Sequence, residues 1–203
     1  MAWLEVETKI RVADVVQSIK DMRERIKKIA KLKKKTKKGD DYFAIKRRGY
    51  PKKAFRIRTE KGKCIVNFKK WLKKYWSKDV VVKEEFEFEL PKKSLDNFLA
   101  LLKDLGFEEW VKKRKVNETY IYNKDKNVSI ELNRVEHLGW FVEIEYLAQP
   151  KDMNKAKKRI RQVLRELGVN QEDIDNTGYT KMLWDKGIRD RKFFLIKKVK
   201  KKL

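Results

Sequence analysis

Cysteine, histidine and proline are scarce in this chain, and each scarcity excludes a type of site or organisation. Cys64 is the single cysteine, so no disulfide can form within the chain, which suits a reducing, cytoplasmic environment. His137 is the single histidine, which excludes a histidine-based metal site or catalytic triad. Three prolines among 203 residues, with no Pro/Ser-rich linker and no repeat, leave nothing that divides the chain.

Long apolar runs are also missing. No run approaches the ~20 residues that span a membrane, and the first ten residues are charged, so we expect neither a membrane span nor a signal peptide. The length fits one domain. We therefore expect a single folded unit over residues 1–185, with residues 186–203 as its basic extension.

Acidic residues are much less frequent than basic residues. The chain carries 55 Lys and Arg against 30 Asp and Glu, a net charge of +25, which implies an anionic partner such as a phosphate compound, nucleic acid or an acidic membrane surface. The lysine runs at 27–38 and 197–202 are interpreted as solvated surface, with the first one leading from a helix into a turn. They receive no catalytic role.

The hydrophobic periodicity predicts strands and helices in alternation. We expect helices from Asp14 to about residue 32, over 94–106 and over 153–167, with a shorter piece at 179–184. We expect eight strands: 4–10, one after the turn at 39–43, 54–59, 64–70, 80–90, 108–122, 128–135 and 140–147.

Charged residues follow the strand period of two, with the signs sorted strand by strand. Glu5, Glu7 and Lys9 share one face of the first strand. The other faces carry Arg56 and Arg58, Asn67 and Lys69, Lys83 with Glu85 and Glu87, Lys112 and Arg114, Glu131 and Asn133, and Glu143 and Glu145. Such faces inside an eight-stranded antiparallel barrel would need a charged ligand. A triphosphate with a divalent metal satisfies both signs, because cations bind phosphate oxygens and carboxylates hold the metal.

The ordered set of these segments resembles the CYTH family, the triphosphate tunnel metalloenzymes that include class IV adenylyl cyclases and triphosphatases. The resemblance covers Glu5 to Leu183, and the ending looks most like the class IV cyclase branch. It rests on Glu5-x-Glu7-x-Lys9, Asp40-x-Tyr42-Phe43, Phe55-Arg56-Ile57-Arg58, the Lys69 strand, Lys83-x-Glu85-x-Glu87, Lys112-x-Arg114, Leu132-Asn133-x-Val135, Leu138-Gly139-x-Phe141-x-Glu143-x-Glu145 and Tyr179.

The resemblance implies an α+β fold, an eight-stranded antiparallel β-barrel that forms a triphosphate tunnel, with flanking α-helices and bound Mg²⁺ or Mn²⁺. Glu5, Glu7, Glu85, Glu87, Glu143 and Glu145 would be metal ligands. Lys9, Arg56, Arg58 and Lys83 would be the catalytic cations, and Lys69, Lys112, Arg114 and Asn133 would bind substrate. Asn133 departs from the family pattern, where an acidic residue is common.

Two activities remain open at this point. In a hydrolase, water attacks the terminal phosphorus of an inorganic, thiamine or nucleoside triphosphate. In a cyclase, the ribose 3′-hydroxyl of ATP attacks the α-phosphorus and pyrophosphate leaves. We expect a small-molecule triphosphate as partner, no membrane, and a monomer or homodimer.

The competing hypothesis is a basic RNA- or polyphosphate-binding module without turnover. The net charge favours it, whereas interior carboxylates that repel phosphate argue against it. Trp71, Tyr75 and Trp76 lie among lysines, and we interpret them as a mobile hydrophobic loop rather than as a surface for stacking a base.

Overall fold

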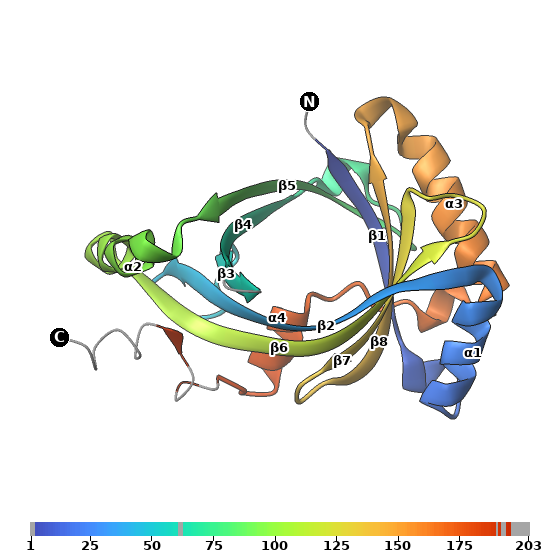
Figure 1. The fold of residues 1–203 in the computed structure, drawn as a ribbon, viewed down its shortest axis with the longest axis horizontal. Helices are drawn as coiled ribbons and strands as arrows, with labels where there is room; N and C mark the ends of the chain where they lie inside the picture. Colours follow the sequence, from blue (N-terminus) through green and yellow to red (C-terminus); the bar gives the residue numbers. More distant parts are fainter. Residues whose placement is uncertain (1–2, 61–62, 190, 192–193, 196–203) are drawn as a thin grey trace.

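Eight strands close into an antiparallel barrel within residues 3–60, 63–189, 191, 194 and 195, which the computed structural model describes (Figure 1). The strands are β1 (Leu4–Arg11), β2 (Ala30–Ile45), β3 (Phe55–Glu60), β4 (Lys63–Trp71), β5 (Val81–Leu90), β6 (Phe107–Tyr122), β7 (Val128–Val135) and β8 (Gly139–Ala148). The helices are α1 (Ile19–Ile29), α2 (Leu95–Asp104), α3 (Met153–Glu166) and α4 (Tyr179–Asp185). Around the barrel the order is β1-β5-β4-β3-β2-β6-β7-β8, so the predicted fold class is confirmed.

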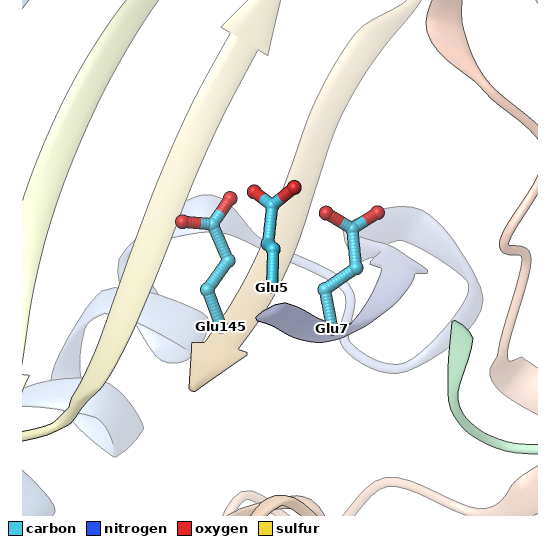
Figure 2. Close-up of side chains that lie close together, drawn as sticks. All are labelled: Glu5, Glu7 and Glu145. Atoms are coloured by element: carbon cyan, nitrogen blue, oxygen red, sulfur yellow. The ribbon is translucent and has the colours of Figure 1, made fainter. Parts of the chain in front are cut away.

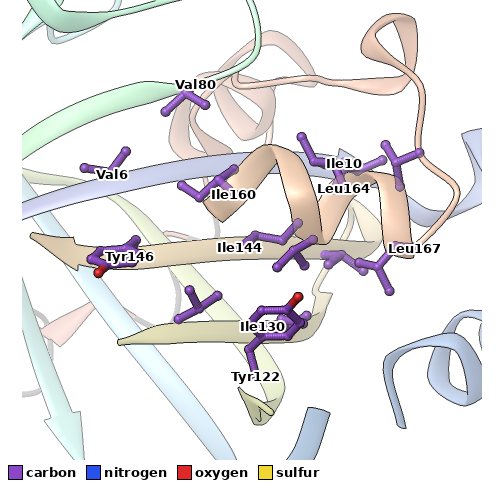
Figure 3. Close-up of a cluster of buried hydrophobic side chains, with 14 of the residues drawn as sticks. Val6, Ile10, Val80, Tyr122, Ile130, Ile144, Tyr146, Ile160, Leu164 and Leu167 are labelled. Atoms are coloured by element: carbon purple, nitrogen blue, oxygen red, sulfur yellow. The ribbon is translucent and has the colours of Figure 1, made fainter. Parts of the chain in front are cut away.

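The main hydrophobic core lies outside the barrel. Val6 and Ile10 of β1 alternate with the charged residues of that strand, and they pack with Ile144 of β8 against Ile160 and Leu164 of α3, as Figure 3 shows. Helices α1 and α3 cover this side of the sheet (Figure 1). Because apolar side chains of β1 and β8 face the helices, the period of two directs their charged neighbours into the barrel.

Two smaller apolar clusters lie where α2 and α4 pack against the barrel. Helix α2 packs Leu99 and Leu102 against Ile57 and Val66 of β3 and β4. Helix α4 joins a cluster at β6 and β8 that includes Phe141. Helix α2 therefore covers an outward apolar face, whereas α4 packs against an inward one, because Phe141 has the strand phase of the charged residues of β8.

The predicted helix start at Asp14 is wrong by several residues. Residues Val12–Asp14 form a single 3-10 turn, and Ser18 caps α1 by accepting a hydrogen bond from the backbone N–H of Asp21 at 3.2 Å. A side-chain oxygen at this position satisfies one of the N–H groups that a helix start leaves unpaired.

The prediction that the lysine-rich segment is a connector is also wrong. It forms the first half of β2, which begins directly after α1 and pairs with β6 from Ala30 to Ile45. Backbone pairing along β6 makes this segment a strand, although its sequence shows no apolar alternation.

Much of the proposed basic extension at 186–203 lies outside the described residues, so its role stays a prediction. No helix in the described part of the chain is long and apolar enough to cross a membrane.

Candidate functional site

Carboxylates from β1 and β8 meet inside the barrel because these strands pair antiparallel. Glu7 lies opposite Glu145, and Lys9 lies opposite Glu143. Glu5, Glu7 and Glu145 offer oxygens that all lie within 4.8 Å of one another, and Figure 2 shows their three carboxylates side by side. Three negative groups at this separation repel each other unless cations lie among them.

A second group shares one member with the first. Glu131 of β7 lies opposite Glu143, and Glu131, Glu143 and Glu145 also offer oxygens within 4.8 Å of one another. Hard divalent ions such as Mg²⁺ and Mn²⁺ prefer carboxylate oxygens. The donor set therefore fits such an ion, and Glu145 could contribute to either position.

Lysines from the neighbouring strands balance these carboxylates. Lys69 donates to Glu5 at 2.6 Å, Lys83 donates to Glu7, and Lys115 lies 3.0 Å from Glu131. Each lysine lines the cavity beside its partner. Since an ammonium can exchange a carboxylate for a phosphate oxygen, these three cations are placed to bind a polyphosphate.

A buried aspartate, Asp40 of β2, organises the remaining cations. Its side chain is fully buried. It accepts hydrogen bonds from Arg58 at 2.6 and 3.1 Å, and it lies 2.8 Å from Lys113 and 3.7 Å from Arg56. The buried Nε of Arg56 has no hydrogen-bond partner among the described residues, and Arg56 itself lines the cavity.

Glu85 and Glu87 lie apart from the two carboxylate groups. Glu85 accepts a hydrogen bond from Asn67 and lies 3.6 Å from both Arg56 and Lys69. Glu87 also accepts from Asn67, at 3.1 Å. Both line the cavity, but neither belongs to a three-member group within the described residues. Glu85 therefore holds two cations in place, and metal ligation by Glu85 and Glu87 stays a prediction.

The predicted phase of β6 is wrong by one residue. Lys112 pairs with Asp41, and Arg114 makes a two-pronged contact with Glu136; neither is among the residues that line the cavity. Lys113 and Lys115 line it instead. The β2–β6 register shifts at Tyr42/Phe43, a bulge in the ladder, and an extra residue there changes which side chains point inward.

Asn133 lies behind the carboxylates. It is fully buried, donates to Glu143 at 2.7 Å and accepts from Asn117 at 2.8 Å. Both ends of its amide are thereby used, so Asn133 orients Glu143. The substrate contact expected of it stays a prediction.

Lys9 ties the barrel to the segment before α4. Its side chain donates to the backbone oxygen of Thr177, and its backbone N–H donates to Asn176 at 2.9 Å. Its ammonium also lies 4.6 Å from the ring centroid of Tyr179. Residues 174–181 line the cavity. Lys9 therefore fixes a segment from the C-terminal part of the chain against the barrel, where it forms part of the cavity wall.

The cavity itself has a volume of about 1230 Å³. Thirteen Lys and Arg and eight Asp and Glu line it among the described residues, and this excess of positive charge suits an anion. A space of this size is somewhat larger than the ~300–1,000 Å³ typical of small-molecule sites.

Burial and charge shift the interior acid–base equilibria. Burial raises the pKa of Glu145 well above its usual range, and Glu131 and Glu5 add to this. Burial would raise the pKa of Glu5 as well, but Lys69 and Lys83 outweigh it and lower that pKa to about 2. Burial lowers the pKa of Lys9 to about 8, against the pull of Glu143. The carboxyls of Glu145 and Glu5 therefore take up protons in different pH ranges, the first above and the second below the ordinary range of a glutamate.

Five site residues were absent from the predicted set: Lys38, Asp40, Lys113, Lys115 and Glu131. Glu131 was visible as the in-phase neighbour of Asn133, and Asp40 stood in the motif that carried the resemblance. The lysines gave no comparable signal, because in a run of lysines the inward positions look like the outward ones.

Known proteins resemble this chain over almost its whole length. The sequence profile described as "CYTH domain" matches residues 4–179. A Methanocaldococcus jannaschii protein named "Putative adenylate cyclase MJ0240" is 28% identical over 183 residues, which cover 88% of this chain and 98% of that protein.

Solved structures from Pyrococcus horikoshii share the fold. PH1819 protein is 28% identical with a TM-score of 0.70, covering 90% of this chain and 99% of its own. PH1012 protein is 29% identical with a TM-score of 0.67, covering 87% of this chain and 98% of its own. The closed barrel, its charged interior and the profile match over 4–179 agree, and this chain belongs to the CYTH domain family.

Proposed function

We propose that the protein is a divalent-metal-dependent enzyme that acts on a triphosphate inside the barrel. The observation that carries this proposal is the coexistence, in one cavity, of two three-carboxylate groups and a larger number of cations. A polyphosphate alone would be repelled by the carboxylates, and a metal alone would be repelled by the lysines and arginines. Only a metal–polyphosphate complex complements both sets.

The metal would be held by Glu5, Glu7 and Glu145, or by Glu131, Glu143 and Glu145. When bound, a divalent ion supplies charge stabilisation to phosphoryl oxygens.

The chain's own cations do the rest of the binding. Lys69, Lys83 and Arg56 surround Glu5, whose pKa responds to all three, so they form one cationic wall along which successive phosphates can lie. Phosphoryl transfer needs mainly positioning and neutralisation of charge. Arg56, which lines the cavity, contributes a further cation to this wall.

Two reactions fit this arrangement. Water attacks the terminal phosphorus, its bond to the bridging oxygen breaks, and diphosphate or a diphosphate ester leaves. Alternatively, the ribose 3′-hydroxyl of ATP attacks the α-phosphorus, which gives cyclic AMP and pyrophosphate. The name of the Methanocaldococcus jannaschii relative supports testing the second reaction.

The test is an assay of purified protein with ATP, tripolyphosphate and thiamine triphosphate, each with Mg²⁺ or Mn²⁺ and with excess chelator. Cyclic AMP, pyrophosphate and orthophosphate are quantified separately. We expect turnover of at least one substrate, which chelation abolishes. Absence of turnover with every substrate and metal would refute the proposal that the protein is an enzyme.

A polyanion-binding module is the second candidate, favoured by the exposed lysines of β2, which include Lys31, Lys35 and Lys37. Replacing Glu143 and Glu145 with Gln separates the two. An enzyme should lose turnover, whereas a simple binder should hold polyanions as tightly as before or tighter, because two repelling charges are gone.

A further inference from the structure

We propose that Trp71 is a stacking platform for the planar ring of an organic triphosphate, so that the site prefers a nucleoside or thiamine-type triphosphate to inorganic tripolyphosphate. This inference rests on the proposed function and specifies its substrate class. It also replaces our interpretation of this segment as a hydrophobic loop.

Trp71 points into the cavity. It lies in phase with Asn67 and Lys69 on β4, and it is the cross-strand partner of Lys83. All four residues line the cavity. Yet Trp71 keeps 40% of its surface exposed, whereas Lys83 beside it keeps 8%. A large apolar ring left open on the wall of a charged cavity has surface available to a ligand.

The ring is held in place by its surroundings. Trp76 lies 5.2 Å from Trp71 between ring centroids, and its indole N–H donates to the backbone oxygen of Val82 at 3.2 Å. On another side the chain passes close by, since a Cβ added at Gly178 would lie 3.9 Å from Cζ2 of Trp71. Because its neighbours fix the ring, stacking on it would cost little conformational entropy.

The platform adjoins the charged site directly. The ammonium of Lys83 lies 4.8 Å from the Trp71 ring centroid and donates to Glu7. A ring stacked on Trp71 is thus separated from the first carboxylate group by one lysine. Its nearest phosphate would lie beside Lys83, and the following phosphates would extend toward Lys69 and Arg56.

Inorganic tripolyphosphate has no group for this surface, whereas a nucleobase or a thiamine ring does. Removing an aromatic platform typically weakens a stacked base by about tenfold. The expected signature is therefore a change in the ratio of two affinities, which a general loss of folding or charge would not produce.

The experiment measures dissociation constants by calorimetry for ATP, thiamine triphosphate and tripolyphosphate, with Ca²⁺ in place of Mg²⁺ to slow turnover. We expect Trp71→Ala to reduce the preference for at least one ring-bearing ligand over tripolyphosphate by about tenfold, and Trp71→Phe to restore most of it. The two ring-bearing ligands distinguish a nucleobase from a thiamine ring. Tyr75→Ala is the matched control, because Tyr75 is an exposed aromatic residue of the turn that follows β4 and does not line the cavity.

If Trp71→Ala leaves the preference for ring-bearing ligands over tripolyphosphate unchanged, or if Tyr75→Ala changes it equally, the proposal that Trp71 is a stacking platform is wrong. Wild-type protein that binds tripolyphosphate but neither ring-bearing ligand would also overturn it, while the proposed function stands. If none of the three ligands binds, both proposals fail.

Discussion

Replacing Asp40 with Asn tests whether one buried carboxylate holds the phosphate-facing cations in position. Asp40 contacts Arg58 at 2.6 Å, Lys113 at 2.8 Å and Arg56 at 3.7 Å, and it is fully buried. An amide has nearly the same shape but no charge, so three cations would be left without their shared carboxylate. Removing one partner of a buried ion pair costs about 3 to 5 kcal/mol, and we expect the free energy of unfolding to fall by that amount.

Urea unfolding with linear extrapolation measures this change. Glu136→Gln is the matched control, because Glu136 makes a similar two-pronged contact with Arg114 while the two side chains are 41% and 35% exposed. Exposed pairs contribute about 0 to 1 kcal/mol. Burial is therefore the main variable that separates the two substitutions.

Added tripolyphosphate provides a second readout, since its negative charge can replace that of Asp40. We expect it to raise the unfolding midpoint more in Asp40→Asn than in the wild-type protein. Although burial opposes it, Lys113, Arg56 and Arg58 hold the pKa of Asp40 well below its usual range. Its stabilisation is therefore present at neutral pH and is lost only as the pH falls through that lowered pKa. A loss no larger than that of Glu136→Gln would refute the reasoning.

Three further measurements test the site. Lys113→Ala should raise the activation free energy for kcat/KM by roughly 1.5 to 3 kcal/mol, the range for a hydrogen bond to a charged group, whereas Lys112→Ala should leave kcat/KM within about twofold; similar losses in both would contradict the β6 register. If Lys9 binds phosphate as its ammonium, as the proposed function requires, kcat/KM should fall above its pKa of about 8, and Lys9→Arg should remove this limb. Since burial and neighbouring carboxylates raise the pKa of Glu145, Mg²⁺ binding should displace a proton at pH values below that raised pKa, detected by calorimetry in buffers of different ionisation enthalpy; Glu145→Gln should reduce the release.

Much of the site could be predicted where apolar and charged residues alternate. Val6 and Ile10 fix the outward face of β1, so Glu5, Glu7 and Lys9 must face the other way. The inward carboxylates of β1 and β8 follow from this local pattern, whereas the confirmed barrel was implied by the resemblance to the family.

The sequence was ambiguous where every position is charged. In Lys112-Lys113-Arg114-Lys115 no apolar residue marks the outward face, so the inward set depends on the β2–β6 register and its bulge. The first half of β2 posed the same problem, since a lysine-rich segment becomes a strand only when a partner offers its backbone.

The acidic strand faces could be read from the sequence because they depend on residues that alternate along one strand, and the ordered set of segments indicated the family and, through that resemblance, the closed antiparallel barrel. The folded chain was needed to see that Asp40 contacts three cations, that Lys113 and Lys115 rather than Lys112 and Arg114 face the cavity, and that Trp71 is exposed next to Lys83. These features arise between strands, where register sets which side chains meet, and register is a property of the folded barrel.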